Sequence, residues 1–96
     1  MRLSLHEVQA IRDCTLKLDP QAKIYLYGSR ANDSLKGGDI DLLILSDDLT
    51  FGDKITLLVD IKLVIGEQKI DLTTAPHDSA KHSAFIAGIF PKALQL

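Results

Sequence analysis

The most constraining feature of this 96-residue chain is a pair of short apolar runs separated by a polar segment. The first run, residues 23–27, is β-branched and aromatic and ends at a Gly-Ser turn. The second run, residues 39–45, carries Asp39 and Asp41 at alternate positions before it becomes continuously apolar. Such runs are typical of β-strands, and residues two apart on a strand face the same side. We therefore expect both carboxylates to point to one side of a sheet.

A third aspartate, Asp71, lies within another apolar run at residues 69–73. Unpaired carboxylates at an apolar strand are costly, because burial disfavours the charged form. A divalent cation removes this conflict, and Mg²⁺ binds a few carboxylates together with substrate phosphates. Three strand-borne aspartates therefore predict a two-metal site for in-line displacement at phosphorus. The alternative for Asp39 and Asp41 is a solvated strand entrance without a metal.

The Gly28-Ser29 turn lies between the first strand and the expected start of a short helix. Glycine lets the backbone approach a phosphate closely, and the amides at a helix start attract anions. The Ser29 hydroxyl adds a further donor. A Gly-Ser turn by itself is common, so an ordinary connection is the alternative. The chain has no glycine-rich loop that ends in Lys-Ser or Lys-Thr, which excludes a P-loop.

Composition limits the classes of protein that the chain can represent. Its hydrophobic content of 46% and charged content of 25% are ordinary for a globular domain. The net charge is −2, without a basic stripe, so DNA or RNA is not expected as a partner. There is no signal-peptide core and no apolar run that would span a bilayer, so we expect a cytoplasmic protein without a membrane segment. The length favours one domain over residues 1–96, and the lone Cys14 is expected to act as a small apolar filler.

Apolar periodicity predicts the element order α-β-β-α-β-α and therefore an α/β (α+β) fold class. Ser4 and Glu7 fit a capping box at the first helix, and Gly66 fits the end of the second. A short helix is expected after Ser29. The C-terminal residues 92–96 are expected to form either an edge strand or a loose tail. The helices are expected at residues 5–18, from residue 50 or 51 to 65, and at about residues 78–89. The strands are expected at residues 23–27, 39–45 and 69–73.

The motifs occur in an order that resembles the nucleotidyltransferases of the DNA polymerase β type. They are Gly28-Ser29-Arg30-Ala31, Asp39-Ile40-Asp41-Leu42 and Ile70-Asp71-Leu72. The short chain and its Gly-Ser-Arg-Ala sequence are similar to the minimal nucleotidyltransferases, which are the antitoxin partners of HEPN-domain toxins. The resemblance implies a small nucleotidyltransferase fold with a short mixed β-sheet flanked by helices.

The same resemblance implies which residues bind the nucleotide. Gly28 and Ser29 would hold the β- and γ-phosphates of ATP. Arg30 would steady the triphosphate or form a surface salt bridge. In the loop that follows, relatives often carry Arg-Gly where this chain has Asn32-Asp33, and Ser where it has Gly38. The additional glycine loosens the loop, whereas every expected metal ligand is present.

The aspartates carry the metal and the reaction in this resemblance. Asp39 and Asp41 would bind both Mg²⁺ ions, and Asp71 would bind the ion that activates the acceptor hydroxyl. AMP would pass from ATP to that hydroxyl with release of pyrophosphate. In this branch the acceptor is typically a tyrosine of the cognate HEPN-type toxin, which is thereby silenced, so a hetero-oligomer is possible.

Two other functions stay open at this point. One is an enzyme of the same fold that acts on a small hydroxyl acceptor, and the other is an antitoxin that neutralises its partner by binding alone. Lys69 shares a strand face with Asp71, so it would either reach a phosphate or be solvated. The C-terminal segment, residues 85–96, is rich in apolar side chains and would form either core or a partner-binding face.

Overall fold

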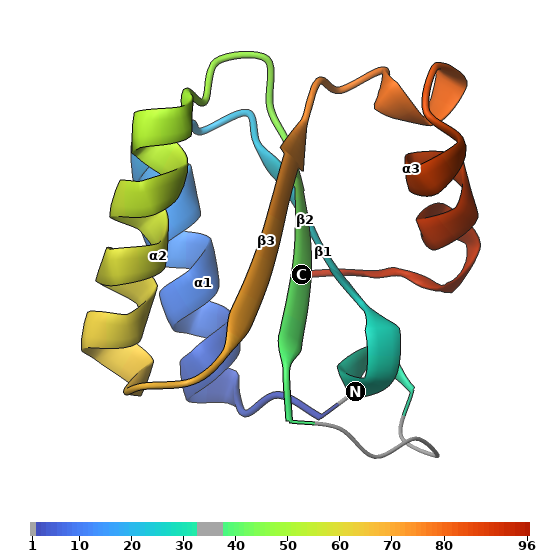
Figure 1. The fold of residues 1–96 in the computed structure, drawn as a ribbon. Helices are drawn as coiled ribbons and strands as arrows, with labels where there is room; N and C mark the ends of the chain where they lie inside the picture. Colours follow the sequence, from blue (N-terminus) through green and yellow to red (C-terminus); the bar gives the residue numbers. More distant parts are fainter. Residues whose placement is uncertain (1, 33–37) are drawn as a thin grey trace.

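In the part of the chain that the structure describes, residues 2–32 and 38–96, a four-stranded mixed sheet carries helices on both faces (Figure 1). The coordinates are a computed structural model. The predicted fold class, α/β with a short mixed sheet flanked by helices, is confirmed. The elements are α1 (Leu5–Leu18), β1 (Lys23–Tyr27), β2 (Ile40–Leu45), α2 (Phe51–Ile65), β3 (Ile70–Ala75), α3 (Ala84–Ile89) and β4 (Leu94–Gln95), with 3₁₀ helices at Gly28–Ala31, Ser79–Lys81 and Phe90–Lys92.

The strand order β3-β2-β1-β4 brings the strands that carry aspartates together. β1 pairs antiparallel with β2, and β4 pairs antiparallel with β1 at one edge of the sheet. β2 and β3 run parallel, because α2 carries the chain back to the same end of the sheet before β3 begins. β3 forms the other edge. The ends of β2 and β3 at which Asp41 and Asp71 lie therefore coincide.

Alternation along the strands divides the sheet into two faces. One face packs against α1 and α2, and the other packs against α3 (Figure 1). The first core contains Ile11, Ile24, Leu26, Ile40, Leu42, Ile44, Leu57, Ile61, Ile70 and Leu72. The second core is smaller, because α3 has only six residues, and contains Leu43, Leu45 and Ile86. The face under α3 is therefore only partly covered.

Capping residues fix the ends of the long helices, and the sequence predicts those at Ser4, Glu7 and Gly66. The Ser4 side chain accepts a hydrogen bond from the Glu7 amide, and the Glu7 carboxylate accepts one from the Ser4 amide. Thr50 and Asp53 form the same capping box at the start of α2. α2 ends at Gly66, whose φ of 91° lies in the left-handed region that favours glycine.

The C-terminal third differs from the prediction. The helix expected over residues 78–89 is divided into a 3₁₀ helix and α3. The division follows from local serine chemistry, because the Ser79 hydroxyl donates to the Pro76 carbonyl and the Ser83 hydroxyl caps α3 by accepting from the Ile86 amide. Residues 94–95 form an edge strand rather than a loose tail.

Smaller differences concern the segments around the motifs. The third strand begins and ends later than residues 69–73, because its pairing with β2 continues to Ala75. The expected short helix begins at Gly28, just before Ser29. The flexible segment expected between Gly28 and Gly38 lies in part, at residues 33–37, outside the described residues.

The outward side of α2 is apolar. Phe51, Ile55, Val59 and Leu63 follow one another at four-residue steps, and each is between 49% and 78% exposed. Residues four apart share one side of a helix, so these side chains form a continuous row, which we call the α2 stripe. No helix within residues 2–32 and 38–96 is long and apolar enough to cross a membrane.

A buried carboxylate at the start of the sheet predicts acid-sensitive stability. Asp19 is 3% exposed, and its pKa lies below the usual value because the Ser46 hydroxyl and then the Gln21 amide donate to it. Asp19→Asn should lower the free energy of unfolding at pH 7 by about 1 kcal/mol, since a charged acceptor becomes neutral. A depressed pKa stabilises the fold above the unfolded value, and the contribution is lost as the pH falls through the folded value. Urea unfolding should therefore show the difference at pH 7 and a smaller one below about pH 4.

Asp48→Asn serves as the matched control, because Asp48 is exposed in the same turn. It should leave the urea midpoint unchanged at both pH values. If the difference in unfolding free energy between Asp19→Asn and the wild type stayed the same in acid, the lowered pKa of Asp19 would not be the source of the stability.

Candidate active site

The predicted aspartates gather at one end of the central strands. Asp41 lies in β2 and pairs directly with Asp71 of β3 in the parallel ladder. Asp39 precedes β2 by one residue, and the Ile40 amide donates to the Lys69 carbonyl at 3.0 Å, which holds the start of β2 beside the start of β3. The structure thus places the three aspartates at the same strand ends, with Asp41 and Asp71 as immediate neighbours.

The alternation of the strands decides which way these aspartates face. Ile40 and Leu42 are fully buried on the α1–α2 side, and Ile70 and Leu72 are buried there as well. Asp41 and Asp71 occupy the intervening positions, so they lie on the opposite face, the one that α3 covers only in part. Asp41 is half-buried and Asp71 is exposed. The carboxylates therefore remain accessible from the α3 side of the sheet.

Burial and the repulsion between the carboxylates together determine the electrostatics of the cluster. The pKa of Asp41 is raised, first by burial, then by the charge of Asp71 and a hydrogen bond with Asp71 that needs a proton, and then by the charge of Asp39. The ammonium group of Lys69 opposes the shift. A cation between Asp41 and Asp71 would relieve this repulsion, as a metal ion does in other carboxylate pairs.

Asp39 has a different partner. The Nζ atom of Lys69 lies 3.4 Å from Oδ2 of Asp39, and both side chains are largely exposed. In the described ranges 2–32 and 38–96, no three side chains of His, Cys, Asp or Glu are assembled as a ready ligand set. The donor set fits Mg²⁺ in its chemistry, since carboxylate oxygens are the ligands that this hard ion prefers. Asp41 and Asp71 are direct neighbours in the ladder. Asp39 would have to give up its ion pair with Lys69 before its carboxylate could bind a metal ion.

Gly28 touches the cluster directly. It follows Tyr27, which pairs with Asp41 in the antiparallel ladder, and its φ of 74° lies in the left-handed region. A Cβ atom at this position would overlap Oδ2 of Asp41. Only glycine therefore lets the turn lie against the carboxylate, and the backbone there is open to a phosphate group.

Ser29 and Arg30 continue this turn as a 3₁₀ helix. Arg30 donates to the carbonyl of Gly38 at 3.0 Å and to the carbonyl of Arg2 at 3.1 Å. Arg2 in turn donates to the carbonyl of Ser29 at 3.2 Å. The guanidinium of Arg30 thus fastens the N-terminal segment and the start of the β2 region to the turn. Its predicted contact with a triphosphate, and that of Ser29, stay predictions.

An aromatic pair that the sequence did not single out for the site lies beside these residues. Tyr27 and Phe85 meet edge to face, with ring centroids 6.5 Å apart and an interplanar angle of 88°. No spacing in the sequence signals Phe85, because it joins the site through the tertiary placement of α3.

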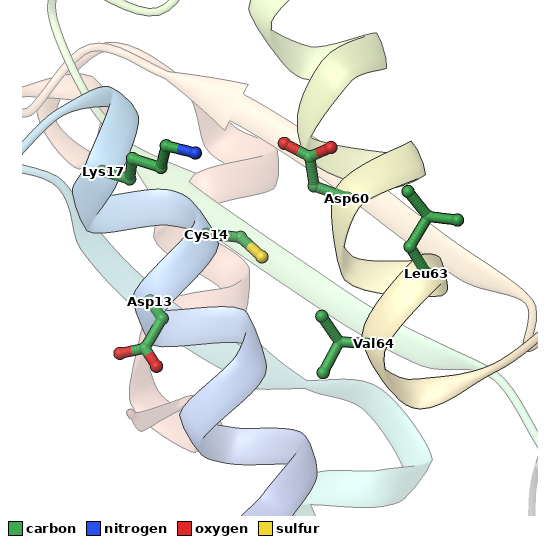
Figure 2. A pocket seen from close by; sticks show the side chains of 6 residues that line it. All are labelled: Asp13, Cys14, Lys17, Asp60, Leu63 and Val64. Atoms are coloured by element: carbon green, nitrogen blue, oxygen red, sulfur yellow. The ribbon is translucent and has the colours of Figure 1, made fainter.

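A groove on the other side of the molecule is separate from the carboxylates. It lies between α1 and α2, has a volume of about 320 Å³, and is lined by Asp13, Cys14, Lys17, Asp60, Leu63 and Val64 (Figure 2). Burial first, and then the nearby acidic residues, raise the pKa of the Cys14 thiol. The thiol is therefore protonated at neutral pH and unsuited to nucleophilic chemistry. Cys14 packs against the main core, as a small apolar filler should.

Two comparisons with known proteins bear on this site. The family model described as "Nucleotidyltransferase domain" matches residues 8–86, most of the chain and every predicted site residue. No curated protein sequence matches the chain.

The repulsion at the cluster predicts an unusual effect of one substitution on stability. Asp71→Asn should stabilise the metal-free protein at pH 7 by about 1 kcal/mol, a gain typical of relieved functional-site strain. The new amide removes a like charge and donates to Asp41. Because the pKa of Asp41 is raised in the fold, its ionisation opposes folding as the pH rises. Below about pH 4 Asp41 is protonated in both proteins, so the extra stability of Asp71→Asn should fade there.

Thermal unfolding in EDTA, and again with excess Mg²⁺, measures this effect. Mg²⁺ should raise the Tm of the wild type more than that of Asp71→Asn, and the exposed-site control Asp48→Asn should follow the wild type. A lower Tm for Asp71→Asn in EDTA would contradict the interpretation.

The close approach of Gly28 to Asp41 gives a second prediction. Gly28→Ala should destabilise the protein by about 1–3 kcal/mol, because the new side chain strains a left-handed backbone and displaces the Asp41 carboxylate. Gly38→Ala is the matched control, since nothing lies within 4 Å of a Cβ atom there. Urea unfolding of both variants at pH 7 tests the prediction. Equal stability of the two would show that the turn adapts.

Proposed function

The chain belongs to the nucleotidyltransferase domain family and is a nucleotidyltransferase, and we propose that it transfers AMP from ATP to a tyrosine hydroxyl of a cognate HEPN-type toxin. In this proposal the protein is a cytoplasmic antitoxin that silences its partner by the modification. The observation that carries the enzymatic part is the direct pairing of Asp41 with Asp71, with Gly28 against Asp41.

The order of these groups across the sheet supports nucleotidyl transfer. Gly28 follows β1, Asp41 lies on β2 and Asp71 on β3, so Asp41 stands between the other two. In-line displacement needs the attacking and leaving oxygens on opposite sides of the phosphorus. A triphosphate on the Gly28 side and an acceptor hydroxyl on the Asp71 side meet this requirement over Asp41.

The reaction exchanges a phosphoanhydride bond of ATP for a phosphoester bond to the acceptor. The tyrosine oxygen forms a bond to the α-phosphorus, and the bond from that phosphorus to the α–β bridging oxygen breaks. Pyrophosphate leaves, and the hydroxyl proton passes to a carboxylate of the cluster. Mg²⁺, held by Asp41, Asp71 and Asp39 once Asp39 leaves Lys69, would supply charge neutralisation for the phosphates. The chain's own backbone at Gly28 and Ser29 would orient the β- and γ-phosphates.

The surface of the molecule supports a protein as the acceptor. The α2 stripe exposes several large apolar side chains, which mark interaction sites when they are contiguous. β3 is an edge strand, so Asp71 can be approached from the rim of the sheet that joins the α2 side to the carboxylate face. A partner that contacts α2 would therefore reach Asp71 without crossing the nucleotide.

The same stripe favours a second candidate function, neutralisation by binding alone. A partner held only by α2 would not need the carboxylates. The two candidates differ in their dependence on Asp41, and substitution of this residue separates them.

Incubation of the purified chain with labelled ATP, Mg²⁺ and the product of the adjacent gene tests the proposal. The partner should gain the mass of AMP, and Asp41→Asn should reduce the transfer rate at least about 100-fold, as loss of a main transition-state contact does. Asp48→Asn should leave the rate unchanged. Neutralisation of the partner by Asp41→Asn without any mass gain would replace the proposal with binding alone. Label found only on small molecules would indicate a small hydroxyl acceptor.

A further inference from the structure

An exposed aromatic side chain lies on the same side of the sheet as the carboxylates, and core packing does not explain its position. Phe85 is 57% exposed, although it is a large apolar residue on the same sheet face as Asp41. Its contact is the ring of Tyr27, which it meets perpendicularly. In a perpendicular pair each ring keeps at least one face free of the other ring.

A neighbouring aromatic pair shows the contrast. Tyr25 and Phe90 also meet edge to face, with centroids 4.9 Å apart, and both pack against the second core with Leu43 and Leu45. That pair closes the core beneath α3. Phe85 lies outside this core and leaves more than half of its surface in solvent. Core packing therefore explains Phe90 but not Phe85.

The position of the aromatic pair beside Asp41 suits a nucleotide. Tyr27 lies directly opposite Asp41 in the antiparallel ladder, where side chains on the same face are about 5 Å apart at Cβ. The Phe85 ring extends the row beyond Tyr27, with its centroid 6.5 Å from that of Tyr27. A nucleotide whose phosphates lie at Gly28 and Asp41 can place its base on this row, since Tyr27 immediately precedes Gly28.

We propose that Phe85, supported by Tyr27, forms the stacking surface for the nucleobase of the bound nucleoside triphosphate. The inference rests on the proposed function and adds the position of the base to it. Stacking on a ring accepts any base, because every base has a π-face. The surface therefore contributes affinity for nucleotides of all bases rather than selection of adenine.

Binding measured without an acceptor tests the inference separately from catalysis. The chain contains two tyrosines and no tryptophan, so a base that stacks beside Tyr27 should quench the intrinsic fluorescence. Phe85→Leu keeps an apolar side chain but removes the π-face, and it should weaken ATP binding about tenfold, the order expected for loss of one stacking partner. Phe85→Tyr should retain wild-type affinity. Inorganic tripolyphosphate, which has no base, should bind the wild type and Phe85→Leu equally.

Phe51→Leu is the matched control, because Phe51 is an exposed phenylalanine on α2, on the opposite side of the sheet. It should bind ATP as the wild type does. Equal ATP affinity of Phe85→Leu and wild type would overturn the inference and leave the proposed function intact. If Phe85→Leu bound ATP normally but modified the acceptor slowly, Phe85 would be an acceptor contact instead. Absence of ATP binding by the wild type would remove both proposals, and circular dichroism checks that each variant is folded.

Discussion

The parallel register between β2 and β3 is the constraint on which both the core and the site depend. Ile40 and Leu42 face the helices together with Ile70 and Leu72, and this burial fixes the register. A shift by one residue would turn every one of these side chains out of the core. The same register brings Asp41 opposite Asp71. Apolar burial under α1 and α2 therefore sets the geometry of the carboxylates on the other face.

This arrangement explains how a repulsive cluster persists in a small protein. The pKa of Asp41 is raised by its surroundings, so the ionised cluster opposes folding. The opposing free energy is met by fully buried side chains such as Leu42, which pack on the far face of the same strand. Lys69 offsets part of the charge from outside by its pairing with Asp39. The destabilising repulsion between the carboxylates is thus offset by the burial of apolar side chains on the other face of the sheet, as is common for functional sites.

The sequence predicted those parts of the fold that local chemistry determines. Both long helices begin and end as expected, because capping boxes and Gly66 act within a few residues of each end. The division of the last helix was not predicted, since apolar periodicity continued through Ser83 while its hydroxyl began a new helix there. Strand ends were shifted where pairing with a neighbour, rather than composition, decides the last residue.

The site shows the same division between local and tertiary information. Alternation along the strand predicted that Asp39 and Asp41 share one side, and the parallel neighbour β3 brings Asp71 beside Asp41. The ion pair between Asp39 and Lys69 was not foreseen, because these residues are thirty positions apart and meet only through the register. Phe85 was not foreseen for a related reason, since its ring reaches Tyr27 through the packing of α3.

The edge position of β3 has a consequence for how a small chain can accept a large substrate. Asp41 is flanked by β1 and β3, so its access is from above the sheet, whereas Asp71 borders an open edge. The site therefore has a closed side, where the Gly28 turn meets Asp41, and an open side at Asp71. A nucleotide fits the closed side, and the open side leaves room for an acceptor that is itself a folded protein.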